Sequence, residues 1–116
     1  AMNIKKEGIF PLVHGVRSMA LAARLRETNT FDRITALQKI SALSEETAAD
    51  LTQSLQFLMG LRLKTGLAEL DKGRQVSGGI DVSHLSSLDR DLLKDSLSVV
   101  KRFKAQIRYR FKLDSL

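Results

Sequence analysis

Apolar residues recur at every third or fourth position in four segments of the chain, with polar residues between them. That spacing is the period of an α-helix with one buried face, and no segment shows the alternation typical of a half-buried strand. The pattern therefore predicts four helices joined by short connections. We expect them over residues 11–26, 30–42 and 45–72, and from residue 87 onward.

Residues with strong preferences for helix ends support these boundaries. Pro11 suits a first helical turn, where its missing N–H costs nothing. Thr30 and Ser44 are placed to cap the second and third helices, because a hydroxyl there accepts a bond from a free backbone N–H. Gly73 is a natural C-terminal stop for the third helix.

The third helix is expected to be the longest, at ~40 Å for its length in residues. Gly60 and Gly66 interrupt it, and each weakens a helix by about 1 kcal/mol relative to Ala. We expect a neighbouring helix or a ligand to approach closely at these glycines. The residues expected on the buried face are Ala48, Leu51, Leu55, Leu58, Met59, Leu63, Leu67 and Leu70.

The last helix is expected to begin after a cap at Ser86 or Ser87. Three long helices and one short helix favour an all-α fold, an antiparallel four-helix up-and-down bundle. At 116 residues the chain forms one domain, 1–116, large enough to bury a core. The residues expected on the buried face of the last helix are Leu88, Leu92, Leu93, Ser96, Val99, Val100, Phe103 and Ile107.

Several kinds of chemistry are absent from the sequence. The chain has no cysteine, which excludes disulfides and thiolate metal sites, and His14 and His84 fit no metal-ligand pattern. Asp89 and Asp91 are spaced by two residues, but no Gly-Ser turn precedes them as in a nucleotidyltransferase centre. We therefore expect no metal site and no catalytic activity from this chain alone. It has no long apolar run, so we expect no membrane segment and a cytoplasmic location.

The formal net charge of +6 suits an anionic partner, whether a nucleotide, an acidic protein surface or nucleic acid. Basic residues near the C-terminus suit phosphate contacts, but they also suit a solvated face at a helix C-terminus. No helix-turn-helix spacing or aromatic platform supports nucleic-acid recognition, so we favour the solvated face. These residues are Lys101, Arg102, Lys104, Arg108, Arg110 and Lys112.

The segment Thr28-Asn29-Thr30 favours local side-chain bonds to the backbone and breaks the helical pattern. Arg33 follows in the first turn of the next helix, and Arg17 and Arg62 lie on stripes that are otherwise apolar. An arginine on an apolar stripe needs a partner, because an unpaired buried charge is costly. The candidate substrate-binding residues are Arg17, Asn29, Thr30, Arg33 and Arg62.

Two interpretations of this set are open. In the first, the arginines bind phosphate or carboxylate bidentately, and backbone N–H groups at the start of the second helix add to the site. In the second, Thr30 only caps a helix, Asn29 closes a turn, and the arginines pair with Asp32, Glu27 or Asp50 within the fold.

Short sequences spread over nearly the whole chain follow one another in a recognisable order. They are Ile4-Lys5-Lys6, Gly8-Ile9-x-Pro11-Leu12-Val13, Arg17, Leu21, Thr28-Asn29-Thr30, Arg33, Leu43-Ser44, Leu61-Arg62-Leu63, Ile80-Asp81, Leu88-x-Arg90 and Leu93-Lys94. Taken together, they resemble the nucleotidyltransferase substrate-binding domain family. The resemblance implies an antiparallel bundle like the one that follows the catalytic domain in kanamycin-type nucleotidyltransferases.

The resemblance also implies a context. The chain would be the C-terminal piece of a bacterial signal-transduction nucleotidyltransferase, related to the uridylyltransferase that modifies the nitrogen-signalling protein PII. Its partners would be upstream nucleotidyltransferase and CBS domains and an acceptor, either a protein or a small molecule. Mg²⁺ and a nucleoside triphosphate would belong to the catalytic domain, and no cofactor is expected in this chain. The alternatives are a structural or homodimerisation module and a weak nucleic-acid binder.

Overall fold

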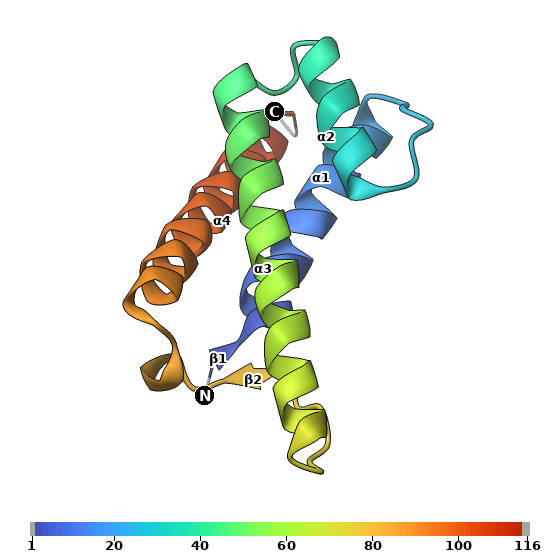
Figure 1. The fold of residues 1–116 in the computed structure, drawn as a ribbon. Coiled ribbons are helices and arrows are strands. Elements are labelled where there is room, and N and C mark those ends of the chain that lie inside the picture. Colours follow the sequence, from blue (N-terminus) through green and yellow to red (C-terminus); the bar gives the residue numbers. More distant parts are fainter. Residues whose placement is uncertain (1, 115–116) are drawn as a thin grey trace.

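Four α-helices follow one another in the computed structural model, which describes residues 2–114 (Figure 1). The all-α class is confirmed. The molecule is elongated, with extents of 50 × 25 × 24 Å, because the two longest helices run along it. Residues 1 and 115–116 of the expected domain lie outside the described part. The helices are α1 (Phe10–Ala22), α2 (Thr30–Lys39), α3 (Glu45–Asp71) and α4 (Ser87–Asp114).

The first helical segment begins earlier than its proline predicts. A π-helical turn, Lys5–Ile9, precedes α1, so Pro11 is not at the start of the helical path. In a regular α-helix the proline ring clashes with the carbonyl four residues before it. The wider π turn, in which the Phe10 N–H donates to the Lys5 carbonyl, lies at the position of that clash. At its other end α1 stops at Ala22 instead of residue 26.

Serine hydroxyls cap the two longest helices. The Ser44 Oγ accepts a bond from the Thr47 N–H at 3.1 Å, which confirms the predicted cap of α3. The Ser86 Oγ accepts a bond from the Asp89 N–H at 3.0 Å, which selects Ser86 over Ser87 as the cap of α4.

Helices α1, α2 and α3 end in the same way, with a residue in the left-handed region of φ. These residues are Arg24 (φ 57°), Ser41 (φ 61°) and Gly73 (φ 71°). The next N–H then reaches back five positions, as when the Leu25 N–H donates to the Ala20 carbonyl at 2.9 Å. Because only glycine takes this conformation without steric cost, Arg24 and Ser41 carry backbone strain that Gly73 avoids.

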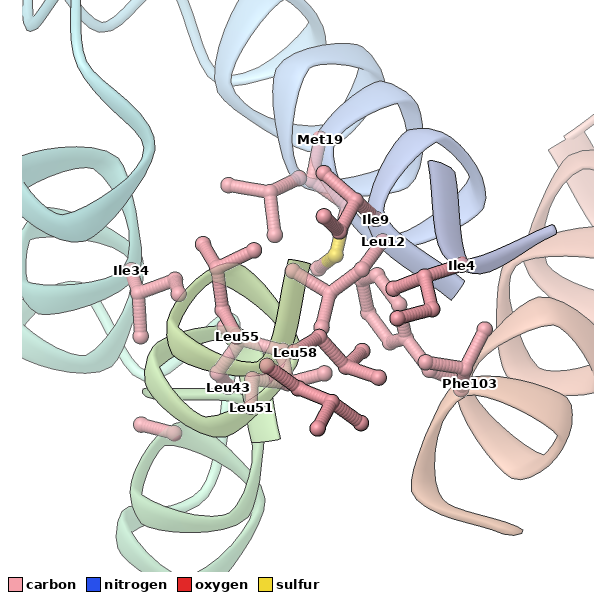
Figure 2. Close-up of a cluster of buried hydrophobic side chains, with 14 of the residues drawn as sticks. Ile4, Ile9, Leu12, Met19, Ile34, Leu43, Leu51, Leu55, Leu58 and Phe103 are labelled. Carbon is pink, nitrogen blue, oxygen red and sulfur yellow. The ribbon is translucent and has the colours of Figure 1, made fainter. Parts of the chain in front are cut away.

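The core lies where α1, α3 and α4 meet, and α2 closes one side of it (Figure 2). Helices α1 and α4 approach closely at Gly15, where an added Cβ would lie 2.7 Å from Cε2 of Phe103. The close approach of a neighbouring helix, one of the two possibilities expected at Gly60 and Gly66, is not found among the described residues. A Cβ on Gly60 would meet nothing within 4 Å, and one on Gly66 would make an ordinary 3.5 Å contact. The largest fully buried side chains are Ile4, Leu12, Val16, Ile34, Leu37, Leu51, Leu55, Leu58 and Val100.

Helix α2 runs in the same direction as α1, so these two helices do not alternate as an up-and-down bundle requires (Figure 1). Val13 and Phe31, near the starts of the two helices, line one groove. Met19 and Leu43, near their ends, line another. The reason is the segment 23–29, which is long enough to return along α1 before α2 begins.

Part of the predicted buried faces is exposed. On α4, Leu88 and Leu92 are 67% and 40% exposed, whereas Leu93 is buried. On α3 more of the predicted buried face is exposed, because α2 is short and covers only the N-terminal half of that helix, here called proximal, and leaves the C-terminal half, here called distal, open. The distal residues predicted to be core but found 48–65% exposed are Met59, Leu63, Leu67 and Leu70.

A small strand pair, which the apolar pattern did not predict, ties the N-terminus to the loop after α3. The strands are β1 (Met2–Asn3) and β2 (Gly79–Ile80), and they pair antiparallel with Met2 opposite Ile80. Two residues are too few for alternation to be visible in a sequence. Among the described residues, no helix is apolar over a length that would cross a bilayer.

Candidate functional site

A groove of about 720 Å³ opens between the start of α2, the distal half of α3 and the beginning of α1. The exposed side of α3 forms one of its walls, so the leucines that were expected in the core line this groove instead. Its apolar lining consists of Ile9, Val13, Phe31, Leu55, Met59, Leu63, Leu67, Leu70 and Val76.

The turn before α2 supplies the polar rim of the groove, from Thr28 through Thr30. Asn29, and not Thr30 as predicted, caps α2, because its Oδ1 accepts a bond from the Asp32 N–H at 2.9 Å. The Asn29 Nδ2 also donates to the Asp32 carboxylate at 2.6 Å. Thr30 is the first helical residue and lines the groove beside its neighbour. The capping interaction therefore fixes the rim and holds the Asp32 carboxylate at the same time.

Arg33 reaches back from the first turn of α2 to the segment before it. Its Nε donates to the Glu27 carbonyl at 2.9 Å, and its side chain is half-buried in the groove lining. This bond uses one of the five N–H donors of the guanidinium group. The terminal nitrogens, which form the fork that binds carboxylate or phosphate, have no described partner in the fold.

Arg62 comes from the middle of α3 and is also half-buried in the groove lining. It lines a second cleft of about 190 Å³ as well, together with Lys5 and Lys6. The two clefts share Arg62 and Val76, so they adjoin at these residues. The groove therefore combines an apolar wall with a basic edge.

The second interpretation holds only in part, because Arg33 bonds to the backbone carbonyl of Glu27, whereas no described carboxylate pairs with Arg17, Arg33 or Arg62. Described contacts between opposite charges include Lys64 with Asp89 at 3.4 Å, and His84 lies 3.5 Å from Asp81, which makes an ion pair only when the imidazole is protonated. The Asp81 carboxyl also accepts bonds from the Ser83 hydroxyl and N–H, which lower its pKa. Neither Arg33 nor Arg62 has a carboxylate within salt-bridge distance among the residues described.

Arg17 is separated from the other candidates. Its side chain is exposed on α1, and it is not among the residues that line the groove. The structure thus brings four of the five predicted residues together, Asn29, Thr30, Arg33 and Arg62, and leaves Arg17 outside.

Sequence reasoning missed the apolar wall and the lysine edge of this site. A signal for the wall was present, because Leu58, Met59, Leu61 and Leu63 are too close together to share one helical stripe. Such a helix has apolar residues on two sides, and only one side is needed for the core. No sequence signal placed Lys5 and Lys6 beside Arg62, since the two segments meet only in the folded chain.

The site has the chemistry of binding. Arginine forks beside aliphatic side chains are suited to a ligand that has both an anionic and an apolar part. Within residues 2–114, no three His, Asp or Glu side chains gather in a way that could hold a metal ion.

The structure is that of a helical domain with a basic-edged, largely apolar groove. The family described as "Putative nucleotidyltransferase substrate binding domain" matches residues 1–111, and the chain belongs to this family. No curated protein and no solved structure matched the chain.

Proposed function

We propose that the chain is the acceptor-binding domain of a bacterial signal-transduction nucleotidyltransferase, and that the groove at Arg33 and Arg62 holds the acceptor. The observation that carries this proposal is a pair of half-buried arginine residues that line one groove without a carboxylate partner in the described part of the chain. A partly buried guanidinium group has lost some of its hydration. An anionic ligand that takes the place of that water therefore stabilises the charge.

The roles of the groove residues follow from their positions. The bond to the Glu27 carbonyl orients Arg33, which then presents its terminal nitrogens to the acceptor. Arg62 binds the same anionic group from α3, or a second one beside Lys5. Asn29 holds the turn that shapes the rim.

The transfer reaction itself would take place in a separate catalytic domain of the same polypeptide. That domain would bind Mg²⁺ and the nucleoside triphosphate, and CBS domains would sense a regulatory ligand in the cytoplasm. Membership of the substrate-binding family supports this division of labour, in which the present chain contributes acceptor binding and orientation.

A labelling experiment in the full-length protein tests the proposal. The protein is incubated with radiolabelled nucleoside triphosphates and an extract of its own cells, and label transferred to the acceptor is counted. Arg33→Gln and Arg62→Gln should each reduce labelling about tenfold at low acceptor concentration, because a partly buried charge contact is lost. Arg17→Gln, which changes an exposed arginine outside the groove, is the control and should label normally. Unchanged labelling by folded Arg33→Gln and Arg62→Gln proteins would contradict the proposal.

The exposed side of α3 favours a second candidate function, pairing of two copies of the chain. A two-fold pair of distal α3 helices would cover Leu63 and Leu67, which are 65% and 53% exposed. Analytical ultracentrifugation distinguishes this candidate. Pairing of two copies requires a dimer that dissociates on dilution and that is absent in Leu63→Gln. A monomer at every concentration would refute this candidate.

A further inference from the structure

We infer that the groove binds an acidic amphipathic α-helix of the acceptor, which is then a protein and not a small molecule. This inference rests on the proposed function and narrows its ligand to one class. It depends on three observations: the spacing of the groove residues along α3, the position of α2 on the same helix, and the charge of the groove.

The groove residues of α3 are spaced as in a helix–helix interface. They recur every three or four positions from Leu55 through Met59, Arg62 and Gly66 to Leu70. That is the spacing with which one helix packs along another. Because Leu55 is buried in the core, the exposed part of the row runs from Met59 to Leu70, about 16 Å or about three helical turns, which exceeds the length of a single amino acid.

Helix α2 already shows how a helix packs beside this row. It contacts the proximal half of α3 and buries Ile34 and Leu37. Helix α2 begins at Thr30, and this residue lies at the edge of the groove. A docked helix would therefore continue the layer that α2 begins, between α1 and α3 (Figure 1). It would remove Leu63 and Leu67 from water, which is favourable.

The charge of the groove selects an acidic helix. Among the described residues, no acidic side chain lines the groove or the second cleft that adjoins it. Four cations do, namely Arg33 and Arg62 in the groove and Lys5 and Lys6 with Arg62 in the cleft. A helix with leucines on one face and glutamates beside them matches both the apolar wall and the basic edge.

A synthetic peptide series tests the inference on the 116-residue chain. The probe is a fluorescein-labelled amphipathic helix of about five turns with leucines on one face and glutamates along its edges. One matched peptide carries glutamine in place of every glutamate, and a second has the composition of the probe in scrambled order. Fluorescence anisotropy measures the binding of each. The glutamate peptide should bind about tenfold more tightly than its glutamine twin. The scrambled peptide should bind no better than that twin.

Variants of the chain locate the contacts. Replacing both Arg33 and Arg62 by Gln should abolish the preference for glutamate, while Arg17→Gln should keep it. Leu63→Gln should weaken binding of the probe, and Leu21→Gln is its matched control, because Leu21 is 61% exposed on α1 outside the groove. Circular dichroism verifies that each variant is folded.

Several outcomes would overturn the inference. These are no binding of the probe at about 1 mM, equal binding of the glutamate and scrambled peptides, and equal losses in Leu63→Gln and Leu21→Gln. Binding of dodecanoate at the groove without binding of the probe would identify a small amphiphile as the occupant. Self-association through Leu63 would identify a second copy of the chain.

The labelling experiment separates this inference from the proposed function. If labelling depends on Arg33 and Arg62 while the peptides do not bind, the acceptor role stands and the helical ligand is wrong. If the probe binds through both arginines while labelling is independent of them, the groove is a helix site and the acceptor role is wrong.

Discussion

Replacing Gly15 by alanine tests the close contact between α1 and α4 against a matched site. Gly15 and Gly60 both lie inside helices, so alanine at either position should gain about 1 kcal/mol of helix propensity. Their surroundings differ. A Cβ on Gly15 would lie 2.7 Å from Cε2 of Phe103, whereas one on Gly60 would meet no atom within 4 Å.

The expected magnitudes follow from these distances. The Phe103 side chain is 2% exposed and has little room to move, and overpacking of this kind costs about 1–3 kcal/mol. After the gain in propensity, Gly15→Ala should therefore lower the free energy of unfolding by ~0–2 kcal/mol. Gly60→Ala should raise it by up to about 1 kcal/mol. In a Phe103→Leu background, which removes the clashing ring atom, Gly15→Ala should also become stabilising.

Urea denaturation followed by far-ultraviolet circular dichroism measures the parent chain and the four variants, because the chain has no tryptophan to report on unfolding. The double-mutant cycle between Gly15→Ala and Phe103→Leu should give a coupling of about 1–3 kcal/mol. If Gly15→Ala stabilises the protein as much as Gly60→Ala does, or if the two substitutions in the cycle are additive, the close packing of α1 on α4 is wrong.

The other predictions concern single side chains, and the same denaturation assay checks them. Leu58→Ala should cost about 2–5 kcal/mol because Leu58 is fully buried, whereas Leu92→Ala should cost less than about 1 kcal/mol because Leu92 is 40% exposed; equal losses would refute the assigned faces. Asn29→Ala should cost about 1 kcal/mol through loss of the α2 cap, and Thr30→Ala should cost clearly less; the reverse order would restore Thr30 as the cap. Arg24→Gly should stabilise by up to about 1 kcal/mol, since its φ of 57° suits glycine, and a loss of stability would contradict the assigned backbone conformation.

The helical periodicity of the sequence is a local property, and it predicted the class of fold and most helix boundaries. The caps at Ser44 and Ser86 and the stop at Gly73 are equally local, and each was expected. The start of the first helix was wrong, because the π turn before Pro11 depends on how the backbone relieves a proline clash. Such a deviation leaves no periodic signal in the side chains.

The direction of α2 and the exposed half of α3 could not be predicted from periodicity. Leu63 and Leu67 have the spacing of core residues, and their exposure depends on how far the short α2 extends along α3. The candidate site was predictable only in part, because its residue types can be read from the sequence but their surroundings cannot. Arg62 was recognisable as a charge on an apolar stripe and Arg33 as an arginine in the first turn of a helix, whereas their lack of carboxylate partners among the described residues emerged only from the fold.

The uneven support of α3 along its length has a consequence for the energetics of binding. Its proximal half packs between α2 and α4, but after Leu61 its leucines are exposed, and the polar bonds there include Lys64 to Asp89 and Ser77 to Glu69. Amide hydrogens in those turns should therefore exchange through local opening, well before global unfolding. A molecule in the groove would have to order the same turns, so part of its intrinsic affinity would be used to stabilise α3. A substitution that stiffens only the distal turns should therefore raise the affinity for the ligand. Gly60→Ala is such a change, and residue 60 does not line the groove.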